Sequence, residues 1–102
     1  MERKLQAMAE PTRLEILRKI WGQELPAGEI AAYFKNVTRP AISQHLQVLK
    51  EAGLVEERRE GTKRLYRLDP DGFAEIKILL EHFCDPRLQR LKDFAQRWRR
   101  WQ

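Results

Sequence analysis

Apolar residues recur at helical spacing through the first half of the chain. Between Pro11 and Trp21 they stand three to four positions apart, which predicts an amphipathic helix that ends at Gly22. A second stripe over residues 26–34 predicts another helix, and a third helix, with Thr38 as its N-cap, is closed by a glycine. The apolar face of these helices is expected to comprise Leu14, Ile16, Leu17, Ile20, Trp21, Ile30, Ala31, Tyr33, Phe34, Ile42, Leu46 and Leu49.

Two short extended segments follow the third helix. Residues 54–59 and 63–68 flank Gly61, whose permissive backbone suits a tight turn, and together they predict a β-hairpin. Two short helices joined by a tight turn and followed by such a hairpin are typical of a winged helix-turn-helix. Helical spacing returns after Asp69, stops near Pro86 and then resumes. Its apolar positions are Phe73, Ile76, Leu80, Phe83, Leu88, Leu91, Ala95 and Trp98.

The chain is expected to form one domain that is mainly α-helical with a small β-hairpin. No internal repeat, low-complexity tract or linker divides its 102 residues, a length that suits a single core. Hydrophobic residues make up 42% and charged residues 34%, which is the balance of a globular protein. We expect residues 11–68 to form the central unit. Residues 1–10 and 70–102 are expected to be helices whose apolar stripes need a partner.

The charge balance is basic. Twenty Lys and Arg against fifteen Asp and Glu give a formal net charge of +5 and a pI near 9.7, which suits a phosphate polymer or another anionic surface as partner. The single Cys84 cannot form an intramolecular disulfide. Without a bilayer-spanning apolar run or a secretory signal, the protein is expected to stay in the cytoplasm and to have no membrane partner.

Three segments carry a resemblance to a known family. They are residues 10–17 (EPTRLEIL), 39–46 (RPAISQHL) and 49–55 (LKEAGLV). In this order, and followed by an arginine-rich hairpin, they resemble the ArsR family of bacterial winged-helix repressors over roughly residues 8–68. The resemblance implies a homodimeric regulator that binds double-stranded DNA, usually a repressor that some signal releases.

One feature of the family is missing from this sequence. Metal-sensing members carry a Cys-x-Cys arrangement near the helix predicted over residues 26–34, and this segment has no cysteine or histidine. His82, Cys84 and Asp85 are too few for a closed tetrahedral zinc site, and Cys84 is either a small buried hydrophobe or a redox-active thiol. No metal or cofactor is therefore expected, and the effector is unknown. The absence of a Ser-His-Asp set or a phosphate-cradling glycine loop argues against an enzyme.

The third helix and the hairpin supply the candidate DNA contacts. Helical spacing puts Arg39, Ser43 and Gln47 in one line with Gln44 beside them, opposite the apolar stripe. This face could equally be solvated, and the basic hairpin could be a solubilising edge, but their place in a winged helix-turn-helix favours DNA. The predicted DNA-binding residues are Thr38, Arg39, Ser43, Gln44, His45, Gln47, Arg59, Lys63 and Arg64.

The expected contacts differ from one of these residues to the next. The amide of Gln44 can donate and accept at once and so match adenine in the major groove, whereas Arg39 can bind guanine bidentately or hold a phosphate. Thr38 is expected to cap the helix and also to contact a phosphate. His45 borders the core, where a hydrogen bond within the protein is at least as consistent as a phosphate contact. The basic hairpin residues are placed to meet a neighbouring phosphate or minor groove.

Apolar positions near both ends of the chain predict a two-fold homodimer. Each large apolar side chain left in water forgoes about 1.5–3 kcal/mol, so a second copy is the simplest cover for such a stripe. A two-fold axis would place two recognition helices in successive major grooves about 34 Å apart, which predicts an imperfect inverted repeat in the DNA. The predicted dimerisation residues are Leu5, Met8, Phe83, Leu88, Leu91, Phe94 and Trp98.

Two other functions are alternatives. A winged-helix module could bind another protein through the stripe of Phe94, Trp98 and Trp101, with only non-specific affinity for nucleic acid. RNA binding is less favoured, because the sequence predicts no sheet with exposed stacking aromatics. Selection from random DNA separates these functions, since only a sequence-specific regulator yields a motif.

Overall fold

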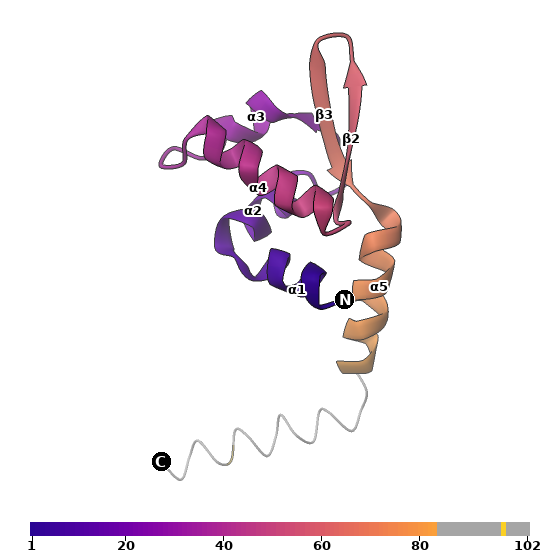
Figure 1. The fold of residues 1–102 in the computed structure, drawn as a ribbon. Coiled ribbons are helices and arrows are strands. Elements are labelled where there is room, and N and C mark those ends of the chain that lie inside the picture. Colours follow the sequence, from indigo (N-terminus) through magenta and orange to yellow (C-terminus); the bar gives the residue numbers. More distant parts are fainter. Residues whose placement is uncertain (84–96, 98–102) are drawn as a thin grey trace.

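The computed structural model describes residues 1–83 and Arg97, and it is mainly helical with one small sheet (Figure 1). The helices pack around the base of a long hairpin, which confirms the predicted arrangement of a helix-turn-helix followed by a wing. In chain order the elements are α1 (Glu2–Ala9), α2 (Pro11–Lys19), β1 (Leu25–Pro26), α3 (Ala27–Ala32), α4 (Arg39–Glu51), β2 (Val55–Glu60), β3 (Lys63–Leu68) and α5 (Pro70–Phe83).

The core forms between the helices and the base of the sheet. In α4 the predicted stripe is confirmed, because Ile42, Leu46 and Leu49 are buried whereas Ser43 and Gln44 are exposed. One face of α4 thus packs into the core while the other face stays open to a partner. The fully buried side chains are Ile16, Ile20, Ile30, Ile42, Leu46, Leu49 and Leu54.

Two aromatic residues that the pattern predicts on the apolar face are exposed, so that part of the prediction is wrong. Helix α2 ends before Trp21, and the chain turns at Gly22, which has a φ of 72°. Trp21 is therefore 68% exposed, although its ring meets Phe73 of α5 edge-to-face with 6.0 Å between centroids. Helix α3 likewise ends before Tyr33, which is 53% exposed.

In the described residues the sheet has three strands rather than the predicted two. The predicted hairpin is confirmed, with Glu60 opposite Lys63 at its tip, and β1 adds to it by pairing antiparallel with β3. Leu25 lies opposite Tyr66, and the strand order is β1-β3-β2. A two-residue strand is too short to show alternation, and its proline, Pro26, is as well suited to the start of a helix.

The start of helix α5 packs closely against the end of α4, and each side of this contact is a glycine. Gly53, with a φ of 82°, closes α4 as predicted, and a Cβ at Gly72 of α5 would overlap the Gly53 carbonyl oxygen. Lys4 of α1 lies over the same junction, and its Nζ is 3.2 Å from Oε2 of Glu75. The junction therefore holds α1 and α5 to the C-terminal end of α4.

The predicted dimerisation residues that the structure describes lie on α1 and α5. Leu5 is 41% exposed and Phe83 is 63% exposed, whereas Met8 is half-buried against the core. Both helices lie on the side of the molecule away from the wing tip (Figure 1). The remaining predicted members fall outside the described residues, and they are Leu88, Leu91, Phe94 and Trp98.

Candidate nucleic-acid interface

Helix α4 presents its N-terminal turn and its polar face to solvent. Thr38 caps the helix, because its Oγ1 accepts a hydrogen bond from the backbone N of Ala41 at 3.3 Å. The capping role predicted for Thr38 is confirmed, while its contact with a phosphate stays a prediction. Ser43, Gln44 and Arg39 are all exposed on this helix.

A polar groove of about 650 Å³ separates α4 from the wing, which rises beside it (Figure 1). Residues 26–29, at the start of α3, form one wall, and Thr62 and Tyr66 contribute from the hairpin. Burial raises the pKa of the Tyr66 phenol, with a smaller effect from Glu57, so Tyr66 is a hydrogen-bond donor at neutral pH. Five of the nine predicted DNA-binding residues line this groove, namely Arg39, Ser43, Gln47, Lys63 and Arg64.

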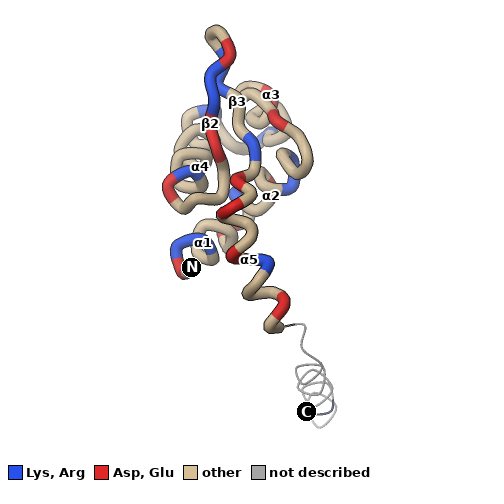
Figure 2. The backbone as a smooth tube through the Cα atoms, turned by 90° about the vertical axis from the view of Figure 1, so that its right-hand side faces the viewer, with Lys and Arg blue, Asp and Glu red and all other residues tan. Residues whose placement is uncertain are grey.

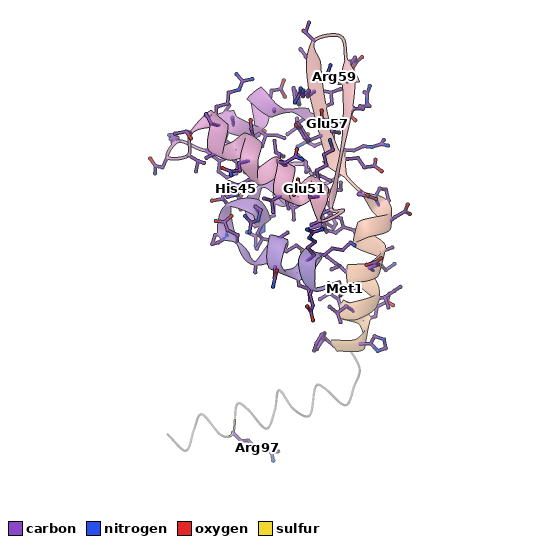
Figure 3. The ribbon with its side chains drawn as sticks, viewed as in Figure 1. Met1, His45, Glu51, Glu57, Arg59 and Arg97 are labelled. Carbon is purple, nitrogen blue, oxygen red and sulfur yellow. The ribbon has the colours of Figure 1, made fainter. Side chains whose placement is uncertain are left out.

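Two predicted contacts lie on exposed surface outside the groove lining. Gln44 is exposed beside Ser43 on α4, where its amide can reach an approaching ligand. Arg59 is exposed on β2, opposite Arg64 in the hairpin register, and Figure 3 places it high on the wing. Gln47 lines the groove, but its Nε2 donates to Oε1 of Glu51 at 3.2 Å, a bond that it must release to reach a base.

Acidic side chains neutralise some of the basic residues of the wing. Nη2 of Arg58 lies 2.6 Å from Oε1 of Glu24, and the hydrogen bond from Arg58 lowers the pKa of this carboxyl below its ordinary value. Nε of Arg67 lies 2.8 Å from Oε2 of Glu56. Figure 2 shows the acidic segment on β2 below the basic segments of the upper wing. Arg58 and Arg67 therefore each have a closer acidic partner than the basic residues beside the groove.

The cations nearer the groove are less neutralised. Nε of Arg64 is 3.6 Å from Oε1 of Glu57. Within the described part of the chain, no acidic group lies within 4.0 Å of the charged heads of Arg39, Arg59 and Lys63. Exposed ion pairs are weak, so Arg64 can exchange its partner for a phosphate at little cost.

His45 faces α2 instead of the groove (Figure 3). Its side chain is 23% exposed, and its Nδ1 is 3.3 Å from Nη1 of Arg13 and 3.8 Å from Oε2 of Glu10. Nε of Arg13 donates to the carbonyl oxygen of Ala7 at 2.8 Å. Two roles were predicted for His45, and the structure shows the one within the protein, a contact with Arg13. A phosphate contact stays a prediction.

Glu10 organises this cluster at the start of α2. Its Oε2 accepts a hydrogen bond from the backbone N of Arg13 at 2.8 Å, which caps the helix. Burial raises the pKa of Glu10, but hydrogen bonds from the backbone of Arg13 and Thr12 and the nearby positive groups outweigh it and leave the pKa below its ordinary value. The cluster ties α1 and α2 to α4 on the side away from the groove.

The sequence patterns did not identify the α3 wall of the groove. Gly28 and Glu29 lie there because α3 packs beside α4. No local sequence pattern predicts which helices pack together. Thr62 could have been found, since it sits in the predicted hairpin turn between basic residues.

The described residues contain neither a candidate metal site nor a membrane span. In residues 1–83 and Arg97, no three His, Cys, Asp or Glu side chains gather as metal ligands. Two of the donors weighed from the sequence, Cys84 and Asp85, lie outside these residues. Over the same part of the chain, no helix has the length and apolar character to cross a bilayer.

Comparison with known proteins places this geometry in a family context. The model of the arsR family of bacterial regulatory proteins matches residues 10–57. The HTH-type transcriptional regulator Rv2034 of Mycobacterium tuberculosis is 45% identical over 82 residues, which cover 80% of this chain and 76% of that protein. The transcriptional repressor SdpR of Bacillus subtilis is 38% identical over 69 residues, or 68% of this chain and 76% of that protein.

Two further matches bear on assembly and on regulation. The solution structure of a homodimeric winged helix-turn-helix DNA-binding domain from Mycobacterium bovis, a possible ArsR-family regulator, matches with 34% identity and a TM-score of 0.67, covering 82% of this chain and 77% of that one. The transcriptional activator HlyU of Vibrio cholerae is 36% identical over 77 residues, or 76% of this chain and 68% of that protein.

Proposed function

Because this chain belongs to the ArsR family of bacterial regulatory proteins, we propose that it is a homodimeric, sequence-specific DNA-binding transcriptional regulator that acts in the cytoplasm as a repressor. The observation that carries the proposal is the polar groove between α4 and the wing, where residues of both elements converge and where Arg39 and Lys63 have no acidic partner among the described residues. The ArsR family consists of transcriptional regulators, which are not enzymes.

In the proposed complex, α4 enters the major groove and the wing lies against the adjacent backbone or minor groove. Gln44 reads an adenine through its amide, and Ser43 makes a smaller contact beside it. Arg59, Lys63 and Arg64 supply phosphate contacts that strengthen binding without selecting sequence. One domain over residues 1–102 does this work, with residues 11–68 as its DNA-reading part.

Repression would follow from occupancy of the operator, where a bound dimer excludes the transcription machinery. The relatives include a protein named as a repressor and one named as an activator, and we propose repression because regulators of this family are usually repressors. A reporter gene placed behind the selected operator tests this direction. Repression predicts lower reporter output with the protein present, and higher output would contradict it.

Selection from random double-stranded DNA tests the proposed function directly. We expect an imperfect inverted repeat to emerge, with half-sites one helical turn apart, because a two-fold dimer presents two copies of α4 on one side. If retention stays weak, salt-sensitive and independent of sequence, the chain is instead a winged-helix module that binds another protein.

Gln44→Ala is expected to relax base preference and to weaken the best half-site by about 1–3 kcal/mol, because one bidentate base contact is lost. The measurement is fluorescence anisotropy with the selected operator and with variants at each base. Gln23→Ala is the matched control, since this exposed glutamine lies in the segment between α2 and β1 and bonds to the carbonyl of Lys19. Unchanged specificity in the Gln44 variant would remove this residue from the reading surface.

Arg64→Ala is expected to weaken all duplexes alike and to lower the slope of log affinity against log salt by about 0.9 for each protomer, the effect of losing one phosphate contact. Arg67→Ala is the control, because Arg67 is paired with Glu56 outside the groove and should leave the slope near its original value. Equal slopes for the two variants would argue against a phosphate contact by Arg64.

A further inference from the structure

We propose that Arg39, in the groove between α4 and the wing, binds a phosphate of the DNA backbone instead of reading guanine. This inference rests on the proposed function and deepens it, because it decides between the two contacts that the sequence allows for Arg39. It also names the side chains that share the phosphate, namely Arg39 from α4 and Lys63 from the wing, on opposite sides of one groove.

The position of the Arg39 guanidinium is the first observation. Its Nη2 lies 3.5 Å from the point that a Cβ on Gly28 would occupy, so the head rests against the start of α3 inside the groove. A guanidinium that reads guanine must extend from the recognition helix toward the base edges with both N–H groups free. The Arg39 guanidinium instead lies against the groove wall, where it can contact a DNA backbone that runs through the groove.

The charges around the groove are the second observation. Arg39 and Lys63 line it with no acidic group within 4.0 Å among the described residues, and the third cation of the lining, Arg64, lies 3.6 Å from Glu57. Unneutralised cations facing each other repel, and a phosphate between them removes that repulsion while releasing counterions. The two unpaired cations of the groove thus favour an anion between them.

One acidic residue belongs to the same groove. Glu29 is exposed on the α3 wall and pairs with no cation within 4.0 Å in the described part of the chain. Its carboxylate would repel a phosphate that lies close to that wall, so the phosphate is expected between the Arg39 head and the wing. The hydroxyl of Thr62 and the phenol of Tyr66 add neutral donors on the wing side.

The test uses full-length protein and the selected operator with one phosphate at a time replaced by an uncharged methylphosphonate. Wild-type protein is expected to lose about tenfold in affinity at one phosphate of each half-site, as for a charge-assisted hydrogen bond. Arg39→Ala should lose a similar factor on the native operator and then show no further loss at that phosphate. Its preference for the best operator over a scrambled duplex should stay unchanged.

Other results would overturn the inference. If Arg39→Ala lowers the preference for one guanine, or if methylphosphonates weaken wild type and variant equally at every position, Arg39 does not bind this phosphate. Arg67→Ala is the control for loss of one positive charge away from the groove. If the wild-type protein shows no sequence preference, the proposed function fails, yet the salt slope of Arg39→Ala on any duplex still decides the inference, since a lost phosphate contact lowers it by about 0.9 and an uninvolved residue does not.

Discussion

Gly72→Ala is expected to lower the free energy of unfolding by about 2 kcal/mol or more. A Cβ at this position would overlap the carbonyl oxygen of Gly53, and this neighbour is backbone that cannot turn aside as a flexible side chain would. Alanine would otherwise favour helix α5 by up to about 1 kcal/mol over glycine. Overpacking typically costs about 1–3 kcal/mol and occasionally more, so we expect the steric effect to win.

Urea denaturation followed by circular dichroism measures this effect, at one fixed protein concentration because the proposed dimerisation would contribute to stability. Gly28→Ala is the matched control. Gly28 is also helical, but its added Cβ would meet only the Arg39 head group at 3.5 Å, an ordinary contact, so we expect no loss of stability. A Gly72 variant as stable as the wild type would mean that α5 can move away from Gly53 freely.

Phe83→Glu is expected to convert the protein to a monomer and to weaken operator binding by about 10²–10⁴-fold. Phe83 continues the apolar stripe of α5 but is 63% exposed within one protomer, so we expect a partner protomer to bury it. Two-fold symmetry places the change in both copies and puts two unpaired carboxylates in an apolar interface. A monomer then loses the gain in effective concentration that comes from binding two half-sites together.

Sedimentation velocity and operator titration, with each protein at the same concentration, check this expectation. Phe83→Leu is the control, because it keeps an apolar side chain and should remain dimeric. Leu5→Glu, on α1, should act in the same direction as the glutamate at position 83. A Phe83→Glu variant that stays dimeric with full affinity would place the interface elsewhere.

The glycine junction connects these two predictions. Gly72 sets α5 directly on the end of α4, and the ion pair of Lys4 with Glu75 adds α1 to the same point. The helices proposed to form the dimer are therefore attached to the C-terminal end of the helix proposed to read DNA. Disturbing the junction should change the angle between the two copies of α4 as well as stability.

The sequence by itself determined the features that depend on neighbours a few positions apart. The cap at Thr38, the apolar stripe of α4 and the glycine that ends it predicted this helix nearly to the residue. The hairpin followed in the same way from residues 54–68, with Gly61 in its turn. Local backbone preference and helical periodicity depend on residues that are close together in the sequence. Both could therefore be predicted without knowledge of the fold.

Only the tertiary structure decided features that join distant parts of the chain. β1 is a strand because it meets β3, and Arg58 is neutralised by Glu24, which lies 34 positions earlier. Trp21 is exposed because α2 stops before it, and His45 turns to Arg13 because α2 packs on that side of α4. Ion pairing and helix packing depend on distances in space, which no local pattern specifies. For this reason the sequence could predict five of the residues that line the groove but could not show that they share it with the start of α3.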